Sequence, residues 1–488
     1  MGIGRPLATS NKGTISGDVV TKTTSDMTLY VRTDGDDSND GLTESTALAT
    51  IQEAVDRVPK FVEHNVTIDI GEGSFKGAQI ANFVFGKAKT FSSQEHIKFT
   101  IEGKLGNPSL STGSVSGVAT SGDQISLTDS SQDWTTNELR GMFCKIGEDY
   151  RLIRENTATT LTFGAKFSTS TSGKDYEVFE PKTTINDFVS ADNNWWDAGL
   201  NIQGLVSNDW HTGRLYIRNL KTDGSDSVIW PIGINITGAN SYLEIQRVQL
   251  VKGQVGVWVD SAWSVHLYEG YMAENNSAGV FLYMTVGTWL TASRIGAYNN
   301  KDGLYCHANA NTGDIDGFFD SNTRYGVYAF GSPAEIDFET DLYIKGNGSH
   351  GIKLENVSFL DLDNAIIEDN GGYGIYIDEN ASGNRVIRTF ANLAGNITIQ
   401  NNTLGGIIAK NHSVVALTNC TGSGNGGYGL ELQTKSYATI TSQTSVTGDS
   451  GDLTIDDGKT VLSYSSDFAN NGDTVTNLYN GCRIERRD

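Results

Sequence analysis

Acidic side chains recur at equivalent positions in three short segments of the second half of the chain. The segments GDIDGF, AEIDFE and FLDLDN align Asp316, Asp337 and Asp361, and Glu339 with Asp363 forms a shorter row beside them. Apolar residues alternate with these acids, so the acids should point outward from strands. Two carboxylates about 5 Å apart repel by roughly 3 kcal/mol at an effective dielectric near 20. A raised pKa, a bound cation or a basic neighbour should relieve that repulsion.

These five acids are therefore candidate catalytic residues. A protonated carboxyl beside an ionised partner is the arrangement that glycoside hydrolysis needs, and neighbouring strands suit a retaining separation whereas alternate strands suit an inverting one. The net charge of −22 also allows an ordinary solvated acidic face. Calcium is an alternative ligand, but no calcium-binding loop is recognisable among these acids, so we expect no required cofactor.

Aromatic side chains form a second set of candidate residues, two and four positions after a recurrent glycine. This set, together with its polar neighbours, is Trp258, Asp260, Phe281, Tyr283, Tyr305, His307, Tyr328 and Tyr376. Aromatic faces beside polar groups stack on sugar rings, which favours a substrate-binding surface. A long outward apolar stripe is also typical of a subunit interface, and both interpretations stay open.

Elimination chemistry would need different groups. It requires a base near a sugar carbon and a cation beside a uronate carboxylate. His266 with Tyr268, or His307 with Arg324, are the candidate pairs for that reaction. No recognisable pectate lyase active-site sequence accompanies them.

A repeat of about 23 residues positions all of these side chains. A glycine followed by an alternating strand recurs at Gly233, Gly256, Gly279, Gly303, Gly326, Gly351, Gly374, Gly406 and Gly429. An asparagine stands three or four residues before most of them, at Asn276, Asn300, Asn322, Asn347, Asn370, Asn402 and Asn425. Asparagine and glycine tolerate a left-handed backbone, so these segments predict turns, and stacked asparagines predict a side-chain ladder. The fold class is therefore all-β, a right-handed parallel β-helix.

The beginning of the repeat region carries a more specific signal. Residues 28–59 predict a strand, a polar turn and a helix over about 48–58, which begins at a Thr50–Glu53 capping box and covers the open first rung. This stretch resembles the N-terminal part of pectate-lyase-like β-helix proteins, particularly bacteriophage tailspike and tail-fibre polysaccharide depolymerases. The resemblance covers residues 27–110 and 185–440.

The expected organisation has five parts. They are an N-terminal tail (1–26), the start of the β-helix with its capping helix (27–112), a small inserted β module (113–180), the β-helix body (181–440) and a C-terminal cap or trimer contact (441–488). The module is expected to be a spacer rather than an accessory sugar contact.

Charge and resemblance together give the functional expectation. A chain of −22 disfavours nucleic acid and an anionic membrane as partners, and no apolar run is long enough to span a bilayer. The resemblance implies a homotrimer in a virion tail, beside other tail proteins, that binds and hydrolyses a bacterial surface or capsular polysaccharide. A non-catalytic receptor-binding tail protein is the alternative, and a secreted polysaccharide lyase or epimerase is the third.

Overall fold

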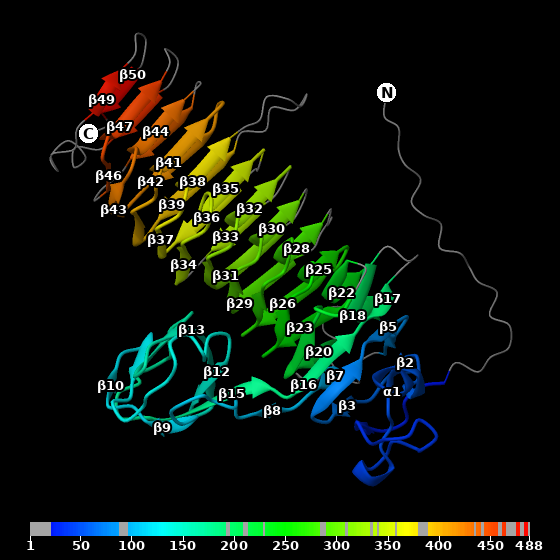
Figure 1. Ribbon diagram of the computed structural model, residues 1–488. Coiled ribbons are helices and arrows are strands. Elements are labelled where there is room, and N and C mark those ends of the chain that lie inside the picture. The colour runs from blue at the N-terminus through cyan, green and yellow to red at the C-terminus, as the bar shows by residue number, and fades with distance from the viewer. Residues whose placement is uncertain are drawn as a thin grey trace, which may run out of the picture.

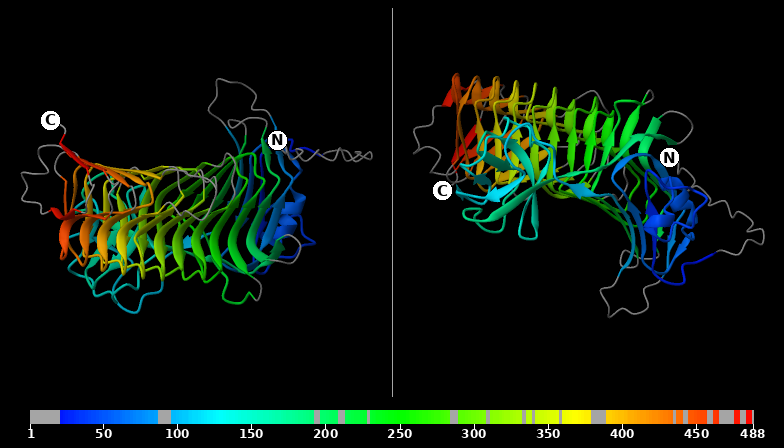
Figure 2. Two further views of the ribbon diagram at one scale, coloured as in Figure 1. Left: turned by 90° about the horizontal axis from the view of Figure 1, so that it is seen from above. Right: turned by 60° about the horizontal axis from the view of Figure 1, so that its bottom comes forward.

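The protein is a right-handed parallel β-helix with a small β module attached to its side (Figure 1). The computed structural model describes residues 21–86, 96–191, 196–207, 213–227, 230–283, 289–307, 311–331, 335–338, 341–356, 359–378, 389–433, 436–440, 444–456, 461–464, 475–478 and 483–486. Three rows of parallel strands, called legs A, B and C here, run along the helix axis (Figures 1 and 2). Among the described residues, no helix is long and apolar enough to cross a membrane.

Leg A carries the predicted acid row. Its strands are β1 (Met27–Val31), β3 (Val66–Ile70), β7 (Ile97–Glu102), β20 (Gly213–Arg218), β23 (Tyr242–Gln246), β26 (Ser264–Tyr268), the first halves of β29 (Trp289–Tyr298) and β31 (Asn311–Asp320), β33 (Glu335–Phe338), β36 (Phe359–Asp363), β39 (Phe390–Ala394), β42 (Val414–Leu417), β45 (Tyr437–Ile440), β48 (Val461–Tyr464) and β50 (Arg483–Arg486). The last pairings run from β45 through β48 to β50, so the β-helix continues past residue 440. These pairings correct the predicted end of the β-helix body at residue 440, and a trimer contact within 441–488 stays a prediction.

Leg B follows leg A in most of the described rungs. Its strands are β4 (Gly73–Lys76), β16 (Thr183–Asp187), β21 (Leu220–Asp223), β24 (Gln249–Val251), β27 (Tyr271–Ala273), the second halves of β29 and β31, β34 (Leu342–Lys345), β37 (Ala365–Glu368), β40 (Ile397–Gln400), β43 (Cys420–Asn425) and β46 (Ser445–Gly448). Leg B is the side of the β-helix on which the inserted module lies (Figure 1).

Leg C completes each rung and carries the predicted aromatic columns. Its strands are β5 (Ala78–Ala81), β18 (Trp196–Gln203), β22 (Pro231–Thr237), β25 (Val255–Asp260), β28 (Ala278–Tyr283), β30 (Asp302–His307), β32 (Tyr325–Phe330), β35 (Ile352–Glu355), β38 (Tyr373–Asp378), β41 (Gly405–Lys410), β44 (Tyr428–Gln433), β47 (Gly451–Asp456) and β49 (Val475–Leu478), with β17 (Val189–Ala191) antiparallel to β18. Alternate residues of all three legs point inward and form one continuous apolar core.

The first rung is covered as the sequence predicts. Helix α1 (Ile51–Arg57) begins after Thr50, whose side chain accepts a hydrogen bond from the backbone N–H of Glu53. The 3-10 helix η1 (Glu44–Thr46) precedes it, and β2 (Phe61–Val62), β6 (Val84–Phe85) and β19 (Val206–Ser207) form a small separate sheet. The apolar stripe of α1 is buried in the core, which closes the open end of the solenoid.

A ladder of buried asparagines joins the rungs where leg B turns into leg C. Each side-chain amide donates to the side-chain carbonyl of the next, in the order Asn275, Asn300, Asn322, Asn347, Asn370, Asn402 and Asn425, with N···O distances of 2.9–3.2 Å. The sequence placed Asn276 first, but Asn276 is exposed and its neighbour Asn275 is the buried member. The ladder itself is confirmed.

The structural reason for glycine at the recurrent positions differs from the predicted one. They lie at the start of leg C strands and do not adopt a positive φ. A Cβ on Gly256 would stand 2.6 Å from the carbonyl oxygen of Gly279, and a Cβ on Gly279 would stand 2.7 Å from that of Gly303. Close stacking of successive rungs therefore requires these glycines, and turn conformation does not.

The inserted module has its own antiparallel sheet and core. Its strands are β8 (Leu105–Gly106), β9 (Ser116–Val118), β10 (Ser121–Gly122), β11 (Ser126–Thr128), β12 (Phe143–Ile146), β13 (Asp149–Asn156), β14 (Thr160–Phe163) and β15 (Asp175–Pro181). The chain leaves leg A after β7 and returns into leg B at β16. A separate apolar cluster, which includes Phe143 and Leu152 of the module and Phe318 of β31, packs the module against the β-helix. Figure 2 shows the module beside the β-helix.

Candidate functional site

Asp337 and Asp361 stand side by side on the outward face of leg A. They lie on β33 and β36 and occupy the same register position. The apolar residues before and after each acid are buried, so both carboxylates face away from the core. Neighbouring strands are about 4.8 Å apart, which brings the two carboxylates into direct electrostatic contact.

The two acids of this pair have different surroundings. Burial raises the pKa of Asp337 above its ordinary range, and the charges of Asp361 and Asp314 raise it further. Asp361 instead accepts a hydrogen bond from the Nδ2 of Asn392 on the next strand, at 2.9 Å. The pair thus combines a carboxyl whose pKa is raised with a neighbouring carboxyl group that accepts a hydrogen bond.

The third acid of the predicted row is displaced by a β-bulge. Thr291 lies opposite Gly313, whereas Ala292 lies opposite Ile315, so Asp314 is one extra residue in β31. Asp314 has a left-handed backbone, with a φ of 53°. The gapless alignment of GDIDGF with the later segments ignored this extra residue, and the predicted position of the third acid is wrong for that reason.

Asp316 lies at the corner between legs A and B. The backbone N–H of Arg294 donates to its carboxylate, and Arg151 of the inserted module contributes a favourable charge. Burial nevertheless raises the pKa of Asp316 to about 6, with Asp341 of the next rung adding repulsion. Asp316 therefore belongs to the junction with the module and not to the outward acid row.

Asp314 is an acid of leg A that the sequence did not identify. Its side chain is exposed, and its charge acts on Asp337, on His266 and on Tyr268. The glycine at the end of GDIDG could have indicated the extra residue. Gly317 has a φ of 130°, a backbone conformation that favours glycine.

Two further predicted acids complete the set. Asp363 lies on the same strand as Asp361, two residues on, and burial together with the Asp361 charge raises its pKa. Glu339 lies outside the described residues. Among the described residues, no group of three or more His, Cys, Asp and Glu side chains is placed to hold a metal ion.

Polar and aromatic groups continue along leg A on the N-terminal side of the acids. Ser264 Oγ lies 2.8 Å from His266 Nε2, and the hydroxyl of Tyr268 lies 3.4 Å from Nδ1 of the same ring. The ring of Tyr242 stacks on His266 with centroids 4.3 Å apart, and the guanidinium of Arg214 lies 4.2 Å from the centroid of the Tyr242 ring. Burial and Arg214 lower the pKa of His266 to about 4, so its imidazole is neutral near pH 7 and a weak base.

The aromatic columns of leg C have the predicted register. One column places Trp258, Phe281, Tyr305, Tyr328, Lys353 and Tyr376 on successive strands, and the next places Asp260, Tyr283, His307, Phe330, Glu355 and Asp378 beside them. All of these side chains are half-buried on the outward face. Burial lowers the pKa of His307, so its imidazole is also neutral near pH 7.

The rings of leg C stack mainly on one another. Tyr305 and Tyr328 are nearly parallel with centroids 4.9 Å apart, and Phe281 lies 4.7 Å from Tyr305 on its other side. Lys353 occupies the next position of this column. Its Nζ lies 5.4 Å from the centroid of the Tyr328 ring and 2.8 Å from a carboxylate oxygen of Glu355. Ring faces that contact neighbouring rings and cations are not free to stack on sugars. The assignment of these rings to substrate binding stays a prediction.

The acid pair and the aromatic columns belong to different faces of the β-helix. Legs A and C form separate parallel rows, and the chain turns a corner between them in every rung (Figures 1 and 2). One sugar residue therefore does not reach both the acids of leg A and the rings of leg C. The sequence predicted the register of the Asp337–Asp361 pair and of the aromatic columns, but nothing in the period showed that they point in different directions.

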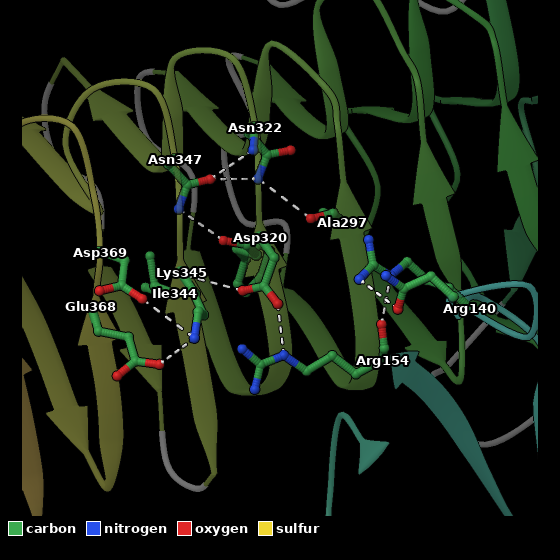
Figure 3. Close-up of polar contacts among 12 residues, drawn as sticks. Arg140, Arg154, Ala297, Asp320, Asn322, Ile344, Lys345, Asn347, Glu368 and Asp369 are labelled. Atoms are coloured by element: carbon green, nitrogen blue, oxygen red, sulfur yellow. Dashed lines mark hydrogen bonds and ion pairs between the residues drawn. The ribbon is translucent and has the colours of Figure 1, made fainter. Parts of the chain in front are cut away.

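A buried ion pair links the inserted module to the β-helix (Figure 3). Arg154 Nε of the module lies 2.6 Å from Asp320 Oδ2, and both side chains are almost inaccessible. The backbone N–H of Lys345 also donates to Asp320, at 3.0 Å. Lys166 makes a second ion pair with Asp341, at 2.6 Å. The module is thus docked against several rungs, and its role as a spacer or as an accessory sugar contact stays a prediction.

Comparison with known proteins agrees with this architecture. Residues 232–391 match a family described as the right handed beta helix region. The chain has the right-handed parallel β-helix fold that this description names. A search of the curated proteins finds no match.

Similar solved structures include two tailspikes and a glycosidase. The tailspike protein gp49 of Pseudomonas phage LKA1 is 11% identical, with 95% of this chain and 65% of that chain covered and a TM-score of 0.27. The tailspike of Acinetobacter baumannii bacteriophage AP22, solved with a capsular saccharide, is 11% identical, with 90% and 75% covered and a TM-score of 0.24. The lacto-N-biosidase of Eubacterium ramulus is 10% identical, with 94% and 67% covered and a TM-score of 0.28.

Proposed function

We propose that this protein is a polysaccharide depolymerase that hydrolyses glycosidic bonds on leg A. The observation that carries the proposal is the register pair of Asp337 and Asp361, in which one carboxyl has a raised pKa and its neighbour accepts a hydrogen bond from Asn392. Most glycosidases use two carboxyl groups whose surroundings differ.

The separation of the pair favours a retaining mechanism. Strands about 4.8 Å apart suit the roughly 5–5.5 Å between the carboxyl groups of retaining enzymes. Asp337 would protonate the leaving oxygen while Asp361 attacks the anomeric carbon, which forms a glycosyl ester on Asp361. Asp337 would then take a proton from water, and that water would cleave the ester and release Asp361.

The expected substrate is a bacterial surface or capsular polysaccharide. We further propose that the protein acts in a virion tail as a homotrimer, beside other tail proteins. Light scattering that gives a particle of three 52.6 kDa chains would support the trimer, and a particle of one chain would contradict it.

The decisive experiment incubates the protein with a panel of purified capsular and O-antigen polysaccharides. New reducing ends and a shift to shorter chains are expected for one of them. Asp337→Asn and Asp361→Asn should each reduce that rate by at least about 100-fold while the affinity for the polymer is kept. Asp369→Asn, which changes an exposed acid on another corner, is the matched control.

Other outcomes separate the competing functions. Binding without turnover by the unaltered protein would assign a receptor-binding tail protein. Products that absorb through a new carbon–carbon double bond would assign a lyase. Neither binding nor cleavage across the panel, with the native host's glycan included, would overturn the proposal.

A further inference from the structure

Trp263 is a large exposed side chain at the edge of leg A. It directly precedes β26, and its side chain is 56% exposed although its backbone N–H is fixed by the carbonyl of Ala239 at 2.9 Å. It contributes nothing to the core of the β-helix. An indole presented in this way from an ordered backbone is suited to contact a ligand.

The residues that follow Trp263 supply the polar groups of a binding site. Ser264, His266 and Tyr268 form one hydrogen-bonded row on β26, and the Tyr242 ring stacks against it. A neutral imidazole, two hydroxyl groups and a stacked phenol can donate to and accept from sugar hydroxyls. This row needs no charged ligand, which agrees with a chain of net charge −22 that would repel a polyanion.

The column of His266 leads to the acid pair through two small residues. In the column that contains His266 and leads toward Asp337, the next positions are Thr291 and Gly313. Thr291 is 7% exposed and Gly313 is buried, so neither residue projects above the surface between this row and the acid pair. The path spans three strand steps, or about 14 Å from β26 to β33.

We propose that Trp263 is the stacking platform of a sugar subsite and that the polysaccharide lies along leg A, from Trp263 over Thr291 and Gly313 to Asp337. The residue stacked on Trp263 is an uncharged hexopyranose, whose hydroxyl groups contact the Ser264–His266 row. This inference rests on the proposed substrate class, and it adds the position and direction of the bound chain.

The test measures binding in the Asp337→Asn background, so that cleavage does not consume the ligand. The probes are the purified capsular and O-antigen polysaccharides of the panel, followed by size-fractionated oligosaccharides of the polymer that binds. Trp263→Ala should weaken the affinity about tenfold, which is the effect of roughly 1.4 kcal/mol of lost stacking. Trp230→Ala is the matched control, because Trp230 is 57% exposed and precedes a leg C strand.

A second variant tests the path rather than the platform. Thr291→Gln lengthens the side chain over which the polymer should pass, and it should weaken binding, whereas Thr291→Ser should not. In the active protein, Trp263→Ala should raise KM with little change in kcat, because the indole contacts sugar away from the reacting bond.

The possible results distinguish a failure of this inference from a failure of the proposed function. If the unaltered protein neither binds nor cleaves any glycan, the function itself fails. If it binds a glycan but Trp263→Ala and Trp230→Ala have equal effects, only the leg A subsite is overturned. A dominant requirement for an anionic sugar would overturn the assignment of an uncharged hexopyranose.

Discussion

At the scale of single residues, three aspartates have different roles because their surroundings differ. Asp337 faces outward beside another acid, Asp316 sits at a corner among arginines, and Asp320 is buried against Arg154. Burial raises the pKa of all three. Only the first has a carboxylate partner on a neighbouring strand, which is why it is the candidate acid.

The coupling of the acid pair can be measured directly. Asp361→Asn removes a negative charge that helps raise the pKa of Asp337, so the pKa of Asp337 should fall toward its ordinary range. Carbon NMR of labelled aspartate carboxyl groups would follow this titration. In an active enzyme, turnover should decline as the pH rises through the raised pKa of Asp337, because the protonated acid is lost. An unchanged titration in the variant would show that the two carboxyl groups are not coupled.

Asp316 should contribute a pH-dependent step to stability. Its pKa is about 6 in the folded protein against 3.8 for the free side chain, so folding favours the protonated form. The free energy of unfolding should therefore fall by roughly 2 kcal/mol as the pH rises from about 4 to about 6. Asp316→Asn should lack this step. Chemical unfolding of both proteins at pH 4, 5, 6 and 7 checks it, and a difference that does not vary with pH would contradict it.

At the scale of elements, the sequence predicts the rungs well because each rung repeats one pattern. Apolar residues at alternate positions fix which side chains point inward, and the pairings of leg A and leg C have the register that this alternation implies. The extra residue Asp314 could not be found in this way, since a bulge is a local exception to the period. The role of Gly256 was also misassigned, because the carbonyl that excludes a side chain comes from the next rung.

The asparagine ladder should make a large contribution to stability. Asn347 donates to the carbonyl of Phe319 and to the side chain of Asn370, and its oxygen accepts the backbone N–H of Asn322, all at 2.9 Å. Asn347→Ala leaves at least two buried polar groups without partners, so the free energy of unfolding should fall by roughly 2–6 kcal/mol. Denaturant unfolding measures the loss. Asn276→Ala is the control, because this exposed asparagine lies outside the ladder and its loss should cost less than about 0.5 kcal/mol.

At the scale of the whole molecule, the β-helix provides separate faces for separate tasks. Leg A carries the acid pair, leg C carries the self-stacked aromatic columns, and leg B carries the docked module. The sequence period predicts a β-helix with several rows of strands. It does not predict which row carries which outward side chains, because this depends on where the chain turns. The docking of the module is the clearest example, since Arg154 and Asp320 are 166 residues apart in sequence.

The buried ion pair of the module gives the last prediction. Arg154 and Asp320 are 10% and 11% exposed. Among the described residues, the hydrogen bond that Asp320 keeps when the arginine is removed comes from the backbone N–H of Lys345, and the charge of Arg140 remains nearby. Arg154→Met should therefore cost about 3–5 kcal/mol at neutral pH, because it leaves a buried carboxylate without its counter-charge. Combining it with Asp320→Asn should restore a large part of that loss.

Hydrogen exchange would show where this loss falls. Strand β13 of the module and its contact strands on leg B should exchange faster in the single Arg154→Met variant, while the ladder from Asn347 to Asn425 stays protected. Burial raises the pKa of Asp320, so lowering the pH neutralises this carboxyl and should reduce the deficit of the single variant. A module that merely spaced two segments would give equal exchange in both proteins at every pH, since no buried charge would then depend on Arg154.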